Sequence, residues 1–318
     1  MARFRWLFQM FLLVGVVLFF AVPAHAMEIP TQPGPEQSNP GDAIRFAEQH
    51  PHSVPPGVND FTCRPDAAHP HPVVLVHGSD GSTYASWAGL SSKLKAAGYC
   101  VFALNYGQEP GTQKFGVETM TKGATELSGF VTDVLSLTGA DKVDVVAHSQ
   151  GATVARYYIN RLGGAADVDK WIGLASPTYG GTFYGLATAL EALPGGTTLI
   201  TNFGSKALAE QVQGSGFLDA LNAGGDTVPG VEYTTIGTRY DEVIQPYTNV
   251  RLRDPGASNI LVQDLCPEDQ TGHFNLPYDP FSQQLVLNTL DPANAVEPTC
   301  TPVPLGTGIA GVIIASNS

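Results

Sequence analysis

One serine of this sequence stands where a serine side chain can act as a nucleophile. Ser149 follows the apolar run Val143–Ala147 and precedes residues 150–162, whose spacing predicts a helix. A sharp turn from a buried strand into a helix lifts the serine Oγ clear of the sheet, and it requires small residues two positions away, here Ala147 and Gly151. The pattern predicts nucleophilic acyl transfer. The alternative is a serine that only caps an ordinary helix.

A base and an acid for this chemistry must come later in the chain. A serine at such a turn is followed by the acid and then by the histidine. His273 is the one histidine after Ser149, so it is the predicted base. Asp241 and Glu242 follow the predicted strand 231–236 directly, where a carboxylate that orients the imidazole is expected. Spacing alone does not choose between these two neighbours.

The negative oxygen that forms during acyl transfer needs hydrogen-bond donors. The predicted strand 72–77 ends in His77-Gly78, and the loop after it is expected at the same sheet edge as the serine. We predict that the backbone N–H groups of Ser79 and Gln150 form this oxyanion hole, with the Ser79 hydroxyl as a third candidate donor. His77 and His148 are expected to have structural roles.

The elements that must position these residues alternate between strands and helices. Short β-branched runs predict strands, and apolar residues three and four apart predict helices. Alternation of this kind predicts an α/β fold with one mostly parallel sheet flanked by helices. The expected strands are 72–77, 100–105, 143–147, 171–175, 231–236 and 259–262, and the expected helices are 84–97, 116–138, 150–162 and 281–290.

Composition divides the chain into segments. Residues 27–60 are rich in Pro, Gln, Asn and Gly and predict an irregular extension with a short helix near Ala43–Gln49, ahead of a main domain over 61–300. Residues 301–318 form an apolar tail too short to span a membrane. Residues 177–230 break the alternation with two weak amphipathic stretches, around Leu186–Leu193 and Leu208–Leu221. They fit a cap or lid over the sheet edge and ordinary core helices equally well.

The first residues have the features of a secretory signal peptide. Arg3 and Arg5 precede an apolar run, and Ala24-His25-Ala26 supplies the small residues of a cleavage site. We expect residues 1–26 to be removed by cleavage after Ala26, which gives a secreted protein. The alternative is an uncleaved anchor, although the run of about 17 residues is short for a bilayer span.

The cysteines and the overall charge narrow the class of protein further. Cys63–Cys100 and Cys266–Cys300 are the predicted disulfides, because each pair closes a loop of moderate length and disulfides persist in exported proteins. No spacing resembles a C-x-x-C metal motif, so neither a metal nor a cofactor is expected. The formal charge of −13 disfavours nucleic acid as a partner. It is compatible with a monomer that meets a neutral lipid–water interface.

Four segments of the chain together resemble a known family. Residues 72–78, the turn 147–151, and the segments 237–247 and 272–280 resemble the secreted class 2 lipases of bacteria, especially those of actinobacteria. The Asp-Glu-x-x-x-Pro run that starts at Asp241 also resembles fungal lipase B. The resemblance extends from about Pro56 to Cys300. It implies an α/β-hydrolase fold, ester substrates that are commonly acylglycerols, disulfides near these cysteines, and Asp241 as the acid.

The sequence therefore predicts a secreted lipase or carboxylesterase that acts through an acyl-enzyme. Ser149, Asp241 and His273 form its expected catalytic triad, and its partner is a lipid or ester substrate. Two alternatives use the same scaffold. One is an acyltransferase that uses the triad on envelope lipids, and the other is a lipid-binding protein without catalytic activity.

Overall fold

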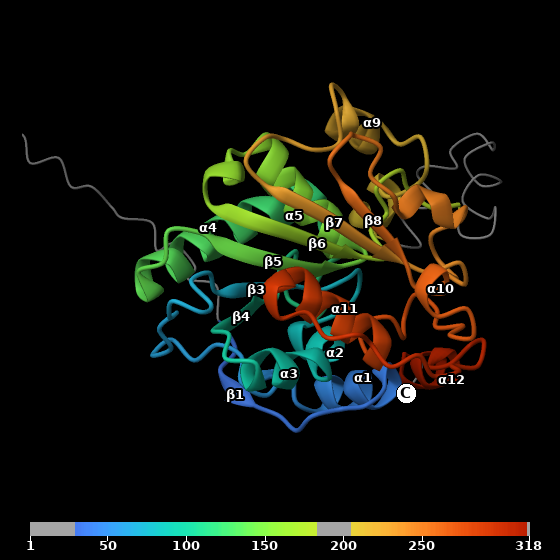
Figure 1. Cartoon of the computed structure of the whole chain (residues 1–318), viewed down its shortest axis with the longest axis horizontal. Coiled ribbons are helices and arrows are strands. Elements are labelled where there is room, and N and C mark those ends of the chain that lie inside the picture. Colours follow the sequence, from blue (N-terminus) through green and yellow to red (C-terminus); the bar gives the residue numbers. More distant parts are fainter. Residues whose placement is uncertain (1–28, 183–204, 317–318) are drawn as a thin grey trace, which may run out of the picture.

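A twisted sheet forms the centre of the protein. The computed structural model describes residues 29–182 and 205–316 (Figure 1). The sheet has six strands in the order β4-β3-β5-β6-β7-β8, and every neighbouring pair is parallel. The strands are β3 (Val73–Val76), β4 (Val101–Leu104), β5 (Val143–His148), β6 (Val168–Leu174), β7 (Glu232–Gly237) and β8 (Ser258–Leu261). The predicted mostly parallel α/β sheet is confirmed.

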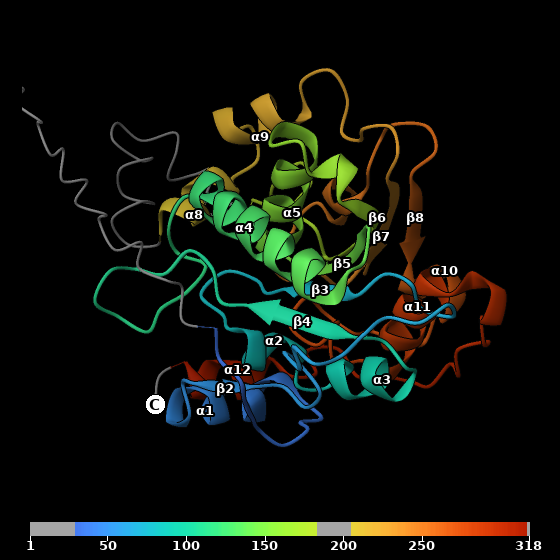
Figure 2. The same cartoon turned by 90° about the vertical axis from the view of Figure 1, so that its left-hand side faces the viewer.

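Helices cover both faces of this sheet, as Figure 2 shows. One face packs against α4 (Met120–Thr138) and α5 (Gln150–Arg161). The other packs against α2 (Thr83–Trp87), α3 (Leu90–Ala96) and α11 (Pro280–Leu290). Successive residues of β3 alternate between the two cores, because side chains of a strand point to opposite faces. This explains why β3 is an uninterrupted apolar run.

Several boundaries differ from the expected ones. The helix expected over 84–97 is two helices, α2 and α3, separated at Ala88-Gly89. Gly89 lies against Tyr278, and an added Cβ there would be 3.0 Å from the tyrosine ring. Helix α4 begins four residues later than expected, because the Thr119 side chain accepts the Lys122 N–H and caps the helix.

The segments near both ends of the described chain are more ordered than expected. The extension contains the expected short helix, α1 (Pro40–Gln49), and in addition a two-stranded sheet of β1 (Gln32–Pro33) and β2 (Ser53–Val54). The apolar tail forms α12 (Ile309–Ala315), which packs beside α1 (Figure 1). An added Cβ on Gly41 would come within 2.7 Å of the Gly311 backbone, so glycines allow the two helices to approach closely.

The described part of the segment 177–230 holds two short helices, α8 (Lys206–Glu210) and α9 (Gly216–Asn222). A single helix over Leu208–Leu221 is therefore wrong, since the chain turns at Gly214, which has a φ of +82°. The expected helix around Leu186–Leu193 and the signal peptide lie outside the described residues. The remaining short elements are α10 (Val262–Leu265), η1 (Gly164–Ala166), η2 (Tyr247–Val250) and η3 (Pro292–Asn294).

Both predicted disulfides are present. Cys63 is bonded to Cys100 with a Cα–Cα distance of 5.7 Å, and Cys266 to Cys300 with one of 5.3 Å. The second disulfide ties residues near the end of the chain to the loop that carries His273. A search of the described helices for one that is long and apolar enough to cross a bilayer finds none.

A buried carboxyl at the start of β5 should make stability depend on pH. Asp144 is 4% exposed, and burial raises its pKa to about 7. The pKa of this carboxyl is above its unfolded value of about 3.9. Its contribution to stability is therefore fully present below about pH 4 and is lost as the pH rises to about 7. Relative to wild type, Asp144→Asn should gain about 1.4 kcal/mol in unfolding free energy per pH unit between about pH 4 and 7.

Chemical denaturation at several pH values measures this gain. Asp141→Asn is the matched control, because Asp141 also lies near His71 but its side chain is 86% exposed. A gain for Asp144→Asn that does not change with pH would show that the carboxyl titrates normally.

Candidate active site

Ser149 lies at a strained joint between β5 and α5. Its φ of 51° and ψ of −128° are unusual for a residue with a side chain, and such strain is typical of nucleophile turns. Its side chain makes no capping hydrogen bond to α5, which disfavours the interpretation of Ser149 as an ordinary helix cap. A Cβ on Gly151 would overlap the carbonyl oxygens of Val76 and His77, so that position has no room for a side chain.

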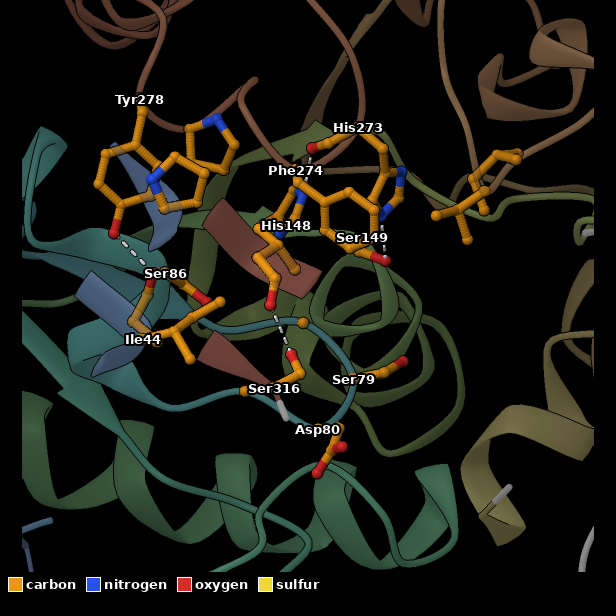
Figure 3. A pocket seen from close by; sticks show the side chains of 18 of the residues that line it. Ile44, Ser79, Asp80, Ser86, His148, Ser149, His273, Phe274, Tyr278 and Ser316 are labelled. Atoms are coloured by element: carbon orange, nitrogen blue, oxygen red, sulfur yellow. Dashed lines mark hydrogen bonds between the residues drawn. The ribbon is translucent and has the colours of Figure 1, made fainter. Parts of the chain in front are cut away.

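The structure brings together the three side chains that the sequence singled out. His273 Nε2 lies 2.9 Å from Ser149 Oγ, and His273 Nδ1 lies 3.0 Å from both carboxylate oxygens of Asp241 (Figure 3 shows the serine and the imidazole). All three side chains are buried. The Asp241 carboxylate also accepts the N–H groups of Val243 and Ile244 at 2.9 and 2.6 Å, which fixes its orientation.

The two neighbouring carboxylates contact different parts of the histidine. Asp241 faces the imidazole, whereas Glu242 Oε2 accepts the backbone N–H of His273 at 2.5 Å. Glu242 is half-buried, and burial raises its pKa. Glu242 is thus anchored to the main chain of the histidine.

The loop after β3 runs against the serine turn. An added Cβ on Gly78 would be 3.3 Å from the Ser149 Cβ. The N–H of Gln150, at the first position of α5, has no partner within the helix. Among the hydrogen bonds of the described residues, none is donated by the backbone N–H of Ser79. Both predicted oxyanion donors therefore lie beside Ser149 with their N–H groups uncommitted.

The hydroxyl of Ser79 has a different partner from the one expected. It donates to Gln150 Oε1 at 2.7 Å, so its proton is used in a contact with the first residue of α5 rather than offered to an oxyanion. Gln211 Nε2 contacts the same two groups, Gln150 Oε1 at 2.7 Å and Ser79 Oγ at 3.0 Å. Gln211 is 4% exposed and follows α8. The segment 177–230 thus supplies a polar residue to the site, which sequence reasoning missed.

Two buried histidines beside the site are neutral. Burial lowers the pKa of His77 to about 4, and burial together with the nearby His273 lowers that of His148 to about 3. His77 donates from Nδ1 to the Gly78 carbonyl at 2.8 Å and accepts the Tyr106 N–H at 3.3 Å. His148 Nε2 lies 3.0 Å from the carbonyl oxygen of His273. Both rings contact backbone N–H or C=O groups, as the predicted structural role requires.

A cavity of about 420 Å³ opens beside Ser149 (Figure 3). Apart from Ser149, His273 and the loop after β3, its walls are mainly apolar. Unexpectedly, α1 and α12 supply part of them, through Ile44 and Val312. Further apolar lining comes from Pro40, Leu208, Val243, Ile244, Phe274 and Pro277.

One cluster of potential metal ligands occurs among the described residues. The nearest ligand atoms of His71, Asp144 and Asp169 lie within 4.8 Å of one another. However, Lys142 Nζ and Lys170 Nζ lie 3.8 and 3.2 Å from the Asp169 carboxylate. Because the protein's own cations neutralise the cluster, we interpret it as an ion-pair network at the opposite end of β5 from Ser149.

The sequence is similar to those of known lipases. The sequence model of the class 2 lipases matches residues 70–285. The chain belongs to the class 2 lipase family. A triacylglycerol lipase of Pseudarthrobacter phenanthrenivorans and another of Burkholderia plantarii are each 36% identical to this chain over 97 residues, or 29% of its length. The aligned stretch covers only about a quarter of the length of those two relatives, 28% and 25% respectively.

Solved structures share the fold. Lipase B of Aspergillus fumigatus superimposes with a TM-score of 0.61 at 20% identity, over 82% of this chain and 68% of that one. The mature lipase BlEst2 of Bacillus licheniformis gives a TM-score of 0.52 at 18% identity, over 73% of this chain and 95% of that one. The chain therefore has the α/β-hydrolase fold that its sequence predicted.

Proposed function

We propose that this class 2 lipase hydrolyses carboxylic esters through an acyl-enzyme on Ser149. The observation that carries the proposal is the chain of contacts from the serine hydroxyl through the His273 imidazole to the Asp241 carboxylate. A hydroxyl with this arrangement of base and acid is activated for attack on an acyl carbon.

The mechanism follows from these positions. Ser149 Oγ attacks the ester carbonyl while His273 Nε2 takes its proton, and Asp241 stabilises the imidazolium that forms. The N–H groups of Ser79 and Gln150 hold the oxyanion. His273 then gives the proton to the leaving alcohol. Water, activated by the same imidazole, cleaves the acyl-enzyme and releases the acid.

The cavity supports an acyl chain as the group transferred to the serine. Its walls are mainly apolar, and burying methylene groups of a substrate there is favourable by about 0.8 kcal/mol each. The relatives named as triacylglycerol lipases support acylglycerols as the substrate class. The two disulfides support export, so we propose that residues 1–26 are a cleaved signal peptide and that the enzyme acts outside the cytoplasm.

A hydrolysis series tests the proposal. Esters and triacylglycerols of increasing acyl length should be cleaved, at concentrations both below and above their solubility. Product analysis with and without an added alcohol separates hydrolysis from acyl transfer. If the purified protein cleaved none of these esters and bound lipid only, the proposal would be wrong.

The walls from α1 and α12 should limit the acyl chain length. Val312→Trp places an indole in the cavity, so we expect kcat/KM for long-chain esters to fall by roughly 10-fold or more, with short-chain esters little affected. Ile44→Trp, in α1, should also lower kcat/KM for long-chain esters. The control is Ile314→Trp, because Ile314 is 62% exposed and does not line the cavity. Equal losses for short and long chains would place the acyl group elsewhere.

A further inference from the structure

The neighbours of two triad residues contact the main chain of the third. Glu242 follows Asp241 in the sequence, and its carboxylate accepts the backbone N–H of His273 at 2.5 Å. His148 precedes Ser149, and its Nε2 lies 3.0 Å from the His273 carbonyl oxygen. Both backbone groups of the histidine are thus held by residues whose own positions are tied to the nucleophile and to the acid.

We propose that His148 and Glu242 are positioning residues that form a clamp on the His273 peptide and aim its imidazole at Ser149. This inference rests on the proposed function, because it assigns these residues a part in the same reaction. Neither residue needs to touch the substrate's reacting atoms. Each acts through the backbone of His273.

The loop that carries His273 explains why a clamp is needed. Apart from turns and an isolated bridge between Asp269 and Val303, the residues between α10 and α11 form no regular element, so the helices at its ends do not by themselves fix the imidazole. A displacement of about 1 Å at a reacting group can cost about 100-fold in rate. Hydrogen bonds to the backbone N–H and to the carbonyl oxygen of His273 tie the histidine to the loop after β7 and to the end of β5, the two places that carry Asp241 and Ser149.

Glu242 is placed for this role at some cost. Its Oε1 is buried and has no hydrogen-bond partner among the described residues, whereas Oε2 holds the His273 N–H. A buried carboxylate oxygen without a hydrogen-bond partner lowers the stability of a protein, so we expect its position to serve another role. Its position also explains Gly272, whose φ lies outside the left-handed region. A Cβ there would overlap the Glu242 carboxylate, so the glycine is required for space rather than for its backbone conformation.

His148 completes the clamp as a hydrogen-bond donor. Its ring is 7% exposed and neutral, so Nε2 carries the proton when it bonds to the His273 carbonyl. The two rings lie 5.0 Å apart between centroids, and Figure 3 shows both at the same wall of the cavity. A neutral His148 also spares the catalytic imidazole a neighbouring positive charge while His273 carries its proton.

The first test replaces Glu242. In Glu242→Ala the His273 N–H loses its partner, so kcat should fall roughly 10- to 100-fold with KM nearly unchanged. Glu242→Gln keeps an acceptor oxygen, so its kcat should stay within about 3-fold of wild type. If the negative charge itself were needed, this variant would lose as much activity as Glu242→Ala. Glu210→Ala and Glu210→Gln are matched controls, since the Glu210 carboxylate accepts the Met120 N–H at 2.7 Å and burial likewise raises its pKa.

The second test uses Gly272 and His148. Gly272→Ala alone should lower kcat, because its methyl group displaces the carboxylate. In the Glu242→Ala background it should add little, and such non-additivity is the signature of a direct contact. His148→Gln retains an N–H donor at the reach of Nε2 and should keep most of the activity, whereas His148→Leu should lose roughly 10-fold or more. Thermal melting of each variant identifies losses that come from unfolding.

The outcomes separate the two hypotheses. If wild type hydrolyses esters but Glu242→Ala and His148→Leu keep its kcat, the clamp is wrong and the proposed function stands. If the variants lose kcat and KM together with their melting temperature, and neither conservative variant restores them, the residues are structural and the clamp is again overturned. An inactive wild type overturns the proposed function and with it any positioning role.

Discussion

Ser149→Ala is expected to lower kcat for ester hydrolysis by about 10⁵- to 10⁶-fold while the protein stays folded. The substitution removes the atom that forms the acyl bond, and the remaining donors cannot supply a nucleophile of similar reactivity. Ser149 makes no capping hydrogen bond to α5, so little stability should be lost with its hydroxyl. KM measured on residual activity, or binding of a non-hydrolysed ester analogue, should remain close to that of wild type.

A serine with an ordinary capping role provides the control. Ser215 caps α9, because its hydroxyl accepts the Leu218 N–H at 3.2 Å. Ser215→Ala should lose about 1 kcal/mol of stability and keep its kcat. Ser149→Ala should therefore lose rate and keep its stability, whereas Ser215→Ala should lose stability and keep its rate. Full esterase activity in purified Ser149→Ala would refute the assignment of the nucleophile.

Asp241→Asn is expected to have the second largest effect, a loss of about 10³- to 10⁴-fold in kcat, by analogy with the same change in serine proteases. An amide that keeps its oxygen toward the N–H groups of Val243 and Ile244 presents its NH₂ to the imidazole. His273 Nδ1 would then have to accept a hydrogen bond, which places the proton on Nε2 and leaves no base for Ser149.

The neighbouring carboxylate makes this a discriminating experiment. Glu242→Gln removes the same charge one residue away, but Glu242 contacts the histidine backbone and not its ring. We therefore expect Asp241→Asn to lose at least 100 times more activity than Glu242→Gln, measured as kcat at a pH above the pKa of histidine. The reverse order would mean that Glu242 orients the imidazole and that the arrangement of these two carboxylates differs in solution.

The parts of the site that the sequence predicted depend on a local turn pattern, on the order of residues in the chain and on the geometry of a parallel sheet. The turn at Ser149 combines a buried strand, small residues on either side and a helix start, and all of these are local. His273 was identified because it is the one histidine after the serine. Parallel strands bring their carboxyl ends to one edge, so residues that follow β5 and β7 were expected to meet there.

The parts that were missed depend on contacts between distant segments. Gln211 reaches Gln150 and Ser79 across 61 and 132 residues, and no local pattern marks it. The cavity wall from α1 and α12 arises because segments from near the two ends of the chain pack together through Gly41 and Gly311. A composition rich in Pro and Gln predicted irregular structure, since propensity describes a segment in isolation and not the surface on which it packs.

Glu242 lies between these two cases. The sequence identified it as one of two candidate acids, and the choice required knowing which carboxylate faces the ring. A clue was available in Gly272, since a glycine can mark a position where another group approaches the backbone closely. The identity of that contact, a carboxylate from the loop after β7, emerges only from the tertiary structure.

Active-site labelling tests the central claim most directly. The protein is incubated with a fluorophosphonate, digested and examined by mass spectrometry, with His273→Ala treated in parallel. We predict stoichiometric modification of the peptide that contains Ser149 in the wild-type protein and a loss of nearly all labelling in the variant. Absence of labelling in the folded wild-type protein, or modification of a different serine, would contradict the account.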